Sequence, residues 1–140
     1  MNLLPRSRLI ALSLSLFLAI LFNCATYTMT TSSLQNQMKD AVPQEGTFTF
    51  TTGGLFLFNK FMYNGIRTIL VKDKDGNEKS INVTNRTGIR ITTKDGSKRT
   101  FYFDTMFIKD NCVIGQKTHF FNWAIKPIPF EEIVKIELQK

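Results

Sequence analysis

The chain is poor in the residues that build metal and catalytic sites. Its 140 residues include one histidine, His119, and two cysteines, Cys24 and Cys112. A structural zinc site takes four Cys, His or carboxylate ligands, and no cluster with that spacing occurs here. A paired-carboxylate site, a nucleophile elbow and a glycine-rich phosphate loop are missing as well. We therefore expect no metal, no cofactor and no enzymatic activity.

One catalytic arrangement stays open in the sequence. Cys112 would become a nucleophile if His119 supplied the base, because a reactive thiol needs a base within hydrogen-bond reach. The alternative is a small buried thiol at the start of a strand, since Cys112 is followed by Val113 and Ile114. The hydrolase hypothesis depends on contact between the Cys112 and His119 side chains.

Long apolar runs are equally scarce, and the longest one ends at Cys24. Leu9 to Phe22 reads LIALSLSLFLAILF, with Arg6 and Arg8 just before it. This run is shorter than the roughly 20 residues that a transmembrane helix needs. A basic start, an apolar centre and a polar exit are typical of a secretory signal peptide. We expect residues 1–23 to be a helical signal peptide and the protein to be exported.

The end of the signal carries a resemblance to a known class. Leu21-Phe22-Asn23-Cys24 resembles the lipobox of bacterial lipoproteins, with Leu three positions before the Cys. The resemblance implies that Cys24 becomes an acylated N-terminus that anchors the protein in a membrane through several chains. Because Ala25, and not Asp, follows Cys24, it also implies the outer membrane, facing the periplasm. A soluble secreted protein, cut near residues 24–28, and an uncleaved signal anchor are the alternatives.

The charge of the chain is positive but dispersed. The formal net charge is +7 at pH 7, and lysines alternate with acidic residues so that no basic cluster forms along the sequence. A nucleic-acid-binding domain needs a dense basic face, so we expect no nucleic-acid partner. A dispersed positive charge suits a weak attraction to anionic headgroups or glycans.

The composition divides the exported chain into two parts. Residues 24–46 are rich in Thr, Ser, Gln and Asn, and we expect the lipid-attachment site followed by a flexible tether with a reach of roughly 25 Å. Residues 47–140 form a single β domain in this interpretation. A short helical turn over residues 34–42 is the one regular element expected within the tether.

The β domain is predicted from turn signals. Phe48 and Phe50 alternate with threonines, and Gly53-Gly54 separates them from the apolar stretch over residues 55–58. Asp75-Gly76 and Asp95-Gly96 each lie between alternating apolar runs, which is the strongest short signal for a hairpin. A third turn falls at residues 109–111, and Glu131-Glu132 suggests a helical turn before a last strand over residues 133–138. Two prolines beside Ile128 exclude a central strand there.

These elements predict an all-β fold, a small antiparallel meander or barrel. The stretch from about residue 65 to residue 140 also resembles the Sm-like and SH3-like barrels of short exported bacterial proteins. The elements that carry this resemblance are Lys94-Asp95-Gly96, the segment over residues 128–133 and Lys135-Ile136-Glu137. The resemblance implies a fold and no function.

Phenylalanine is the one residue type whose abundance points to a function. There are 13 phenylalanines, and apolar residues fill almost every position from Leu55 to Tyr63. Either all of these rings build the core, or one face stays exposed and contacts a partner. We take Phe56, Phe58 and Phe61 as the candidate contact surface. The sequence thus predicts a lipid-anchored envelope protein that binds an envelope protein or glycan, or, as alternatives, a periplasmic domain that binds an apolar molecule or glycan, or a soluble secreted protein.

Overall fold

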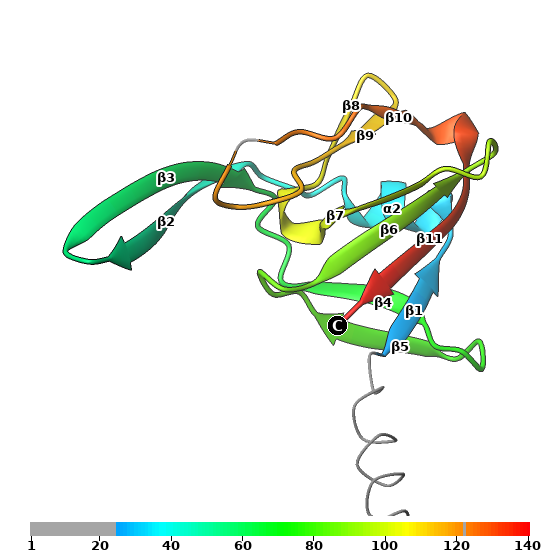
Figure 1. Ribbon diagram of the computed structural model, residues 1–140. Coiled ribbons are helices and arrows are strands. Elements are labelled where there is room, and N and C mark those ends of the chain that lie inside the picture. Colours follow the sequence, from blue (N-terminus) through cyan, green and yellow to red (C-terminus); the bar gives the residue numbers. More distant parts are fainter. Residues whose placement is uncertain (1–24, 122) are drawn as a thin grey trace, which may run out of the picture.

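The computed structural model describes residues 25–121 and 123–140, with the side chains of residues 48, 50, 52 and 55–57 left out. Cys24 and the expected signal peptide lie outside the described residues. The fold is all-β, as predicted, with antiparallel sheets (Figure 1). The regular elements are β1 (Thr26–Met29), α2 (Thr31–Gln37), β2 (Gln44–Thr52), β3 (Leu55–Tyr63), β4 (Thr68–Lys72), β5 (Glu78–Asn82), β6 (Gly88–Thr93), β7 (Lys98–Tyr102), η1 (Phe103–Thr105), β8 (Phe107–Lys109), β9 (Cys112–Ile114), β10 (Ile128–Pro129), η2 (Phe130–Glu132) and β11 (Ile133–Gln139).

A six-stranded sheet with the order β5-β4-β1-β11-β6-β7 forms the body of the domain. A second sheet, β10-β9-β8, packs above it, and the hairpin of β2 and β3 extends sideways (Figure 1). Apolar side chains at every second strand position fill the space between the sheets, since the side chains of a strand point alternately to its two faces. Ile89 and Ile91 of β6 and Ile136 and Leu138 of β11 are buried there.

The predicted hairpins are confirmed. β4 pairs with β5, β6 with β7, and β8 with β9. Gly76 and Gly96 have positive φ angles of 83° and 81° in the first two turns, the backbone conformation that such hairpin turns require. The hairpin of β2 and β3 also follows the predicted break at Gly53-Gly54. The helical turn η2 and the edge strand β10 lie where the proline pattern places them.

The arrangement of these hairpins differs from a meander or a barrel. β1 and β11 lie between the first two hairpins, and the third hairpin belongs to the other sheet. β5 and β7 are edge strands, so the main sheet is not closed. The barrel implied by the Sm-like and SH3-like resemblance is therefore wrong. β11 is amphipathic, and pairing with both β1 and β6 places Ile136 and Leu138 in the core.

The expectation of a tether over residues 24–46 is wrong for most of its length. β1 pairs along its whole length with β11, from Thr26 opposite Gln139 to Met29 opposite Ile136, and it also contacts β4. Helix α2 follows directly, and the Thr30 hydroxyl caps it by accepting the N–H of Ser33 at 3.1 Å. These residues belong to the folded domain.

Helix α2 is held by its apolar side and by one amide. Leu34 is fully buried and Met38 nearly so. The Gln37 side chain donates to the carbonyl of Leu70 at 2.9 Å and accepts the Leu70 N–H at 2.6 Å. Gln37 thus satisfies both backbone groups of a β4 residue, a role that a polar composition does not reveal. The helix begins before the turn expected over residues 34–42.

Candidate binding surface

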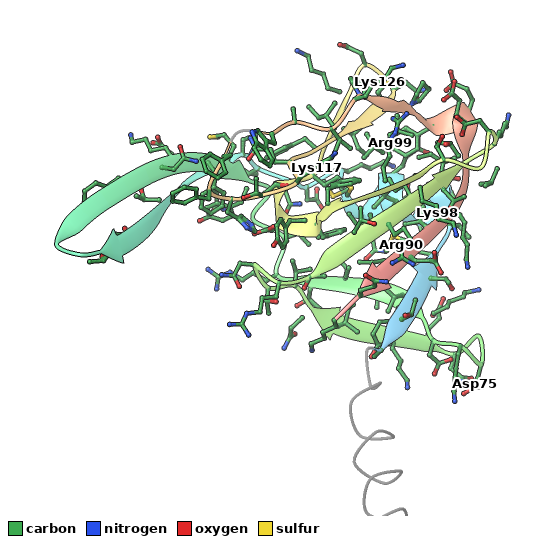
Figure 2. The ribbon with its side chains drawn as sticks, viewed as in Figure 1. Asp75, Arg90, Lys98, Arg99, Lys117 and Lys126 are labelled. Carbon is green, nitrogen blue, oxygen red and sulfur yellow. The ribbon has the colours of Figure 1, made fainter. Side chains whose placement is uncertain are left out.

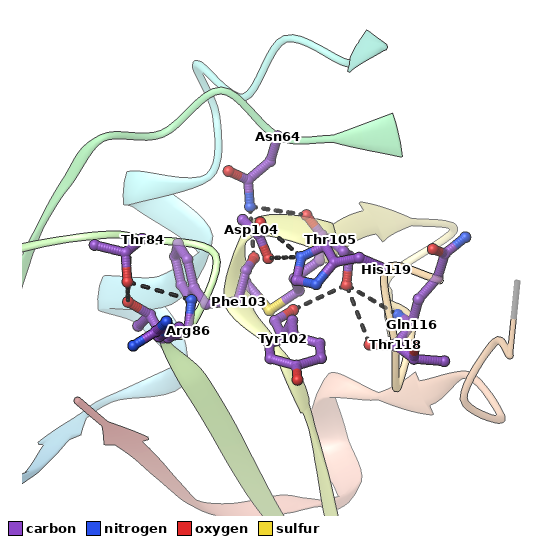
Figure 3. A network of polar contacts seen from close by, with 12 residues as sticks. Asn64, Thr84, Arg86, Tyr102, Phe103, Asp104, Thr105, Gln116, Thr118 and His119 are labelled. Carbon is purple, nitrogen blue, oxygen red and sulfur yellow. Dashed lines mark hydrogen bonds and ion pairs between the residues drawn. The ribbon is translucent and has the colours of Figure 1, made fainter. Parts of the chain in front are cut away.

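A mostly buried His–Asp pair lies where the β2–β3 hairpin meets the body of the domain. His119 Nε2 is 2.8 Å from Asp104 Oδ2 and 3.0 Å from Oδ1 (Figure 3). The two side chains are only 10% and 13% exposed. Asp104 lies in η1, whereas His119 lies in the long connection between β9 and β10. The pair therefore fixes that connection to the core.

The backbone around Asp104 is fixed by a buried amide. The Asn64 N–H donates to the Asp104 carbonyl at 2.7 Å, and the Asn64 side chain donates to the carbonyls of Phe103 and Met106. Figure 3 shows these contacts on one side of η1, with the His119 pair beside them. Such a buried polar network is rigid because each of its groups has a defined partner.

The start of the connection is fastened to η1 in the same way. The Thr105 hydroxyl donates to the Tyr102 carbonyl at 3.0 Å and accepts the Gln116 N–H at 3.1 Å (Figure 3). Gln116 also forms an isolated bridge with Ala124. Lys117 and Trp123 are therefore held next to each other, with the Lys117 N–H donating to the Trp123 carbonyl at 2.9 Å.

Aromatic rings enclose His119. Its ring lies 4.8 Å from that of Phe61, edge-on, and 4.3 Å from that of Tyr102. The Asn59 side chain donates to the His119 carbonyl at 3.2 Å, which ties the loop to β3 as well. The hairpin and the loop thus hold each other in place through His119.

The loop ends in exposed aromatic side chains. Phe121 and Trp123 stack at 5.2 Å with an interplanar angle of 20°, and Phe120 meets Phe121 edge-on at 4.6 Å. Phe121 is 50% exposed and Trp123 63% exposed. We call Phe121 and Trp123 the aromatic platform. A stacked and solvent-facing pair of rings is a surface suited to binding, because large aromatic side chains otherwise contribute to the core.

The predicted contact residues divide among different environments. Phe58 is 68% exposed on β3, as a contact residue requires. Phe61 is only partly exposed and packs against His119. The side chain of Phe56 lies outside the described residues, as does Cys24. The structure therefore adds Phe121 and Trp123, which the sequence analysis does not select as contact residues.

The structure also contains a mostly apolar pocket of about 340 Å³, which reaches Ala124, the residue after Trp123. Its lining includes Pro43, Met62, Phe107, Ile114 and Ala124. A second pocket, of about 270 Å³, borders Asp104 on the other side and is lined by aromatic and polar residues. Both volumes are near the lower end of the range for small-molecule sites, about 300 Å³ and upward.

The Cys112–His119 hypothesis finds no support in the geometry. Cys112 is a free thiol at the start of β9, where it pairs with Lys109 and Pro129. The hydrogen bonds of His119 go to Asp104 and Asn59, and none joins it to Cys112. In the described ranges, no three His, Cys, Asp or Glu side chains lie together in a way that could hold a metal ion.

The ionisable groups in the turns have structural partners. The hydroxyls of Thr93 and Ser97 donate to the Asp95 carboxylate, at 2.6 Å and 2.7 Å, and lower the pKa of Asp95 to about 2. The ion pair with Lys79 lowers the pKa of Asp73 in the other hairpin. These carboxylates stabilise their own turns.

No helix within residues 25–121 and 123–140 has both the length and the apolar character needed to cross a bilayer. The chain matches no protein-family model, no curated protein and no solved structure.

Proposed function

We propose that the protein is a non-enzymatic binding domain of the cell envelope, attached through an acylated Cys24, and that it binds an envelope glycan with the aromatic platform. The observation that carries this proposal is the exposed stack of Phe121 and Trp123 close to His119, which the mostly buried pair with Asp104 fixes to η1. Flat aromatic faces contact the apolar C–H faces of sugar rings. Preorganisation matters because ordering a loop at the moment of binding lowers affinity.

The attachment at Cys24 would also orient the domain. β1 begins at Thr26, and the Ala25 carbonyl accepts the Lys140 N–H at 3.3 Å. A membrane anchor at Cys24 would then connect almost directly to the sheet. The domain would lie at the membrane surface with little rotational freedom, and the platform would keep a constant direction.

The attachment is tested by intact mass and membrane fractionation, with Cys24→Ala as the variant. A mature mass that starts at Cys24 and includes acyl chains, with loss of the variant from the membrane fraction, supports the anchor. An unmodified chain that starts near Thr26 would instead identify a soluble secreted protein.

The binding is tested by cosedimentation with purified, insoluble peptidoglycan. We expect Trp123→Ala and Phe121→Ala to lower the bound fraction several-fold. Val134→Ala is the matched control, because Val134 is 59% exposed on β11 and its loss changes exposed apolar area elsewhere. Equal sedimentation of all variants would contradict a role for the platform.

The apolar pocket favours a second candidate, a domain that binds a small apolar molecule. Its lining by Met62, Phe107 and Ile114 provides few polar groups, which suits an acyl chain or another lipophilic compound. Native mass spectrometry of the protein purified from its own envelope would show a bound mass in this case. Displacement of that mass by 1-anilinonaphthalene-8-sulfonate would support the pocket as the site.

A further inference from the structure

A groove lined with positive charge runs beside the edge strand β7. It has a volume of about 480 Å³ and lies between β7 on one side and Lys117 and residues 124–126 on the other. We call its four cationic residues, Lys98, Arg99, Lys117 and Lys126, the cationic groove (Figure 2). These residues come from two segments that are separated in the sequence, so the fold creates a cluster that the dispersed charge pattern does not show.

The groove cations form no ion pair with any of the described residues. The groove lining contains no carboxylate. The ion pairs among the described residues involve Lys60, Lys79, Lys135 and His119, and none of the groove cations. Asp95 interacts with Arg99 only electrostatically, and this interaction is the weakest of the effects on the pKa of Asp95. Like charges placed together repel each other, and a bound anion removes that repulsion.

The groove contains fixed donors as well as mobile lysines. Arg99 Nη1 donates to the carbonyls of Lys126 at 3.0 Å and Pro127 at 3.4 Å, which holds the guanidinium across the groove. The Tyr102 N–H points away from β6 and donates to Gln116. In an antiparallel strand every second residue points its N–H to the same side, so the N–H groups of Lys98 and Thr100 also point away from β6, toward the groove.

The groove adjoins the aromatic platform through the backbone of Trp123. Lys117 lines the groove, and its N–H is bonded to the carbonyl of Trp123. Ala124, the residue after Trp123, is part of the lining. A single extended ligand can therefore contact the rings and the cations together.

We propose that the cationic groove binds the carboxylate or phosphate groups of an anionic polysaccharide whose sugar rings lie on the platform. The choice of a polysaccharide as the ligand rests on the proposed function, whereas the binding of an anion in the groove does not. Arg99 supplies directional hydrogen bonds to an oxyanion. The three lysines supply charge that attracts successive anionic groups along the polymer.

The position of the groove favours a polymer over the headgroups of the anchoring membrane. Figure 2 shows Lys126 and Arg99 at the end of the domain opposite the start of β1. An anchor at Cys24 would hold the start of β1 at the membrane, so the groove would face away from it. Electrostatic attraction between exposed charges fades over about 8–10 Å at physiological salt.

Lysines at a sheet edge, such as Lys98 on β7 and Lys117 and Lys126 beside it, also have a purely protective role, because they prevent edge-to-edge pairing of sheets. In that case reversing their charge changes self-association and leaves anion binding untouched. The test below therefore measures binding and oligomeric state on the same samples.

The experiment uses the full-length mature protein in a non-ionic detergent and follows Trp123 fluorescence, since the chain has one tryptophan. Polygalacturonate is the anionic probe and dextran the neutral one. The variant is Lys117→Glu/Lys126→Glu, with Lys117→Gln/Lys126→Gln as a milder form. The matched control is Lys72→Glu/Lys74→Glu near the β4–β5 turn, which changes the net charge equally and lies outside the groove lining. Circular dichroism verifies the fold, and sedimentation velocity the oligomeric state.

We expect polygalacturonate to bind more tightly than dextran, and the groove variant to bind it about tenfold more weakly than the control, which corresponds to about 1.4 kcal/mol. Competition by inorganic phosphate that is lost in the groove variant supports a discrete anion site. Equal affinity of the groove and control variants for polygalacturonate overturns the proposal. The proposal is also overturned if the native protein binds micelles that contain phosphatidylglycerol more tightly than it binds polygalacturonate. A groove that binds anions while Trp123→Ala keeps full affinity for peptidoglycan would refute the platform function alone.

Discussion

Leu34→Ala distinguishes a folded N-terminal segment from a tether. Leu34 is fully buried under the main sheet, within residues that the composition assigns to a flexible linker. Removing a buried leucine side chain to alanine costs about 2–5 kcal/mol, because both the transfer energy and the packing around the cavity are lost. A leucine in a solvated tether contributes almost nothing to stability.

The expected loss is a large fraction of the total. A domain of this size has a stability of about 5–15 kcal/mol, and each kcal/mol shifts Tm by about 4–8 °C in small domains. A Tm decrease of about 8 °C or more is therefore expected. Asn36→Ala is the control, since Asn36 is exposed on the same helix and a surface substitution changes stability by about 0.5 kcal/mol or less.

The assay is urea unfolding followed by circular dichroism and by Trp123 fluorescence. Circular dichroism reports the sheet, and the fluorescence reports the loop at the other end of the domain. Coincident transitions, both shifted to lower urea, would show that α2 belongs to the same cooperative unit. The packing of α2 is refuted if Leu34→Ala and Asn36→Ala unfold at the same urea concentration.

Three further perturbations test the surroundings of the platform and the turns. Gly115→Ala should cost about 1–3 kcal/mol in urea unfolding, because its new Cβ would lie 2.6 Å from Phe101 Cδ2, and an unchanged midpoint would contradict this packing. The pKa of Asp95 is lowered to about 2 from 3.8, so its stabilisation is present above about pH 4 and is lost as the pH falls toward 2; Asp95→Asn should flatten the pH dependence of Tm in that window. His119→Ala should lower the free energy of unfolding by about 1–3 kcal/mol, because Asp104 loses its partner in a mostly buried place. The same variant should increase acrylamide quenching of Trp123 fluorescence. Quenching equal to that of the native protein would mean that the pair does not hold the loop.

The sequence predicts local structure well where the turn chemistry is specific. Gly76 and Gly96 occupy positive-φ positions, and the strands on either side follow from alternation. The order of the hairpins does not follow, because it depends on which strands β11 joins. β1 is four residues long and carries two threonines, a pattern that also suits a linker.

The candidate site could be predicted only in part. Phe58 can be selected from the sequence because its strand is apolar at almost every position, so that one of its two faces has to be exposed. The His119–Asp104 pair joins residues that are 15 positions apart, and a single histidine carries no spacing signal. The same holds for the cationic groove, since Lys117 and Lys126 meet Lys98 and Arg99 only after the loop folds against the edge of β7.

The absence of a tether changes how the proposed binding would work. A domain on a flexible linker can reach a ligand anywhere within its length, but it must lose that freedom on binding. Here β1 lies in the centre of the sheet, directly after the expected anchor. The reach of the groove would then be set by the height of the domain above the membrane, and a partner would have to come within that height. An inserted flexible linker of 20 residues between Cys24 and Ala25 should therefore preserve the affinity for polygalacturonate measured in detergent and reduce binding to peptidoglycan only in membranes, where orientation matters. Equal binding in membranes with and without the insert would show that the fixed orientation has no role.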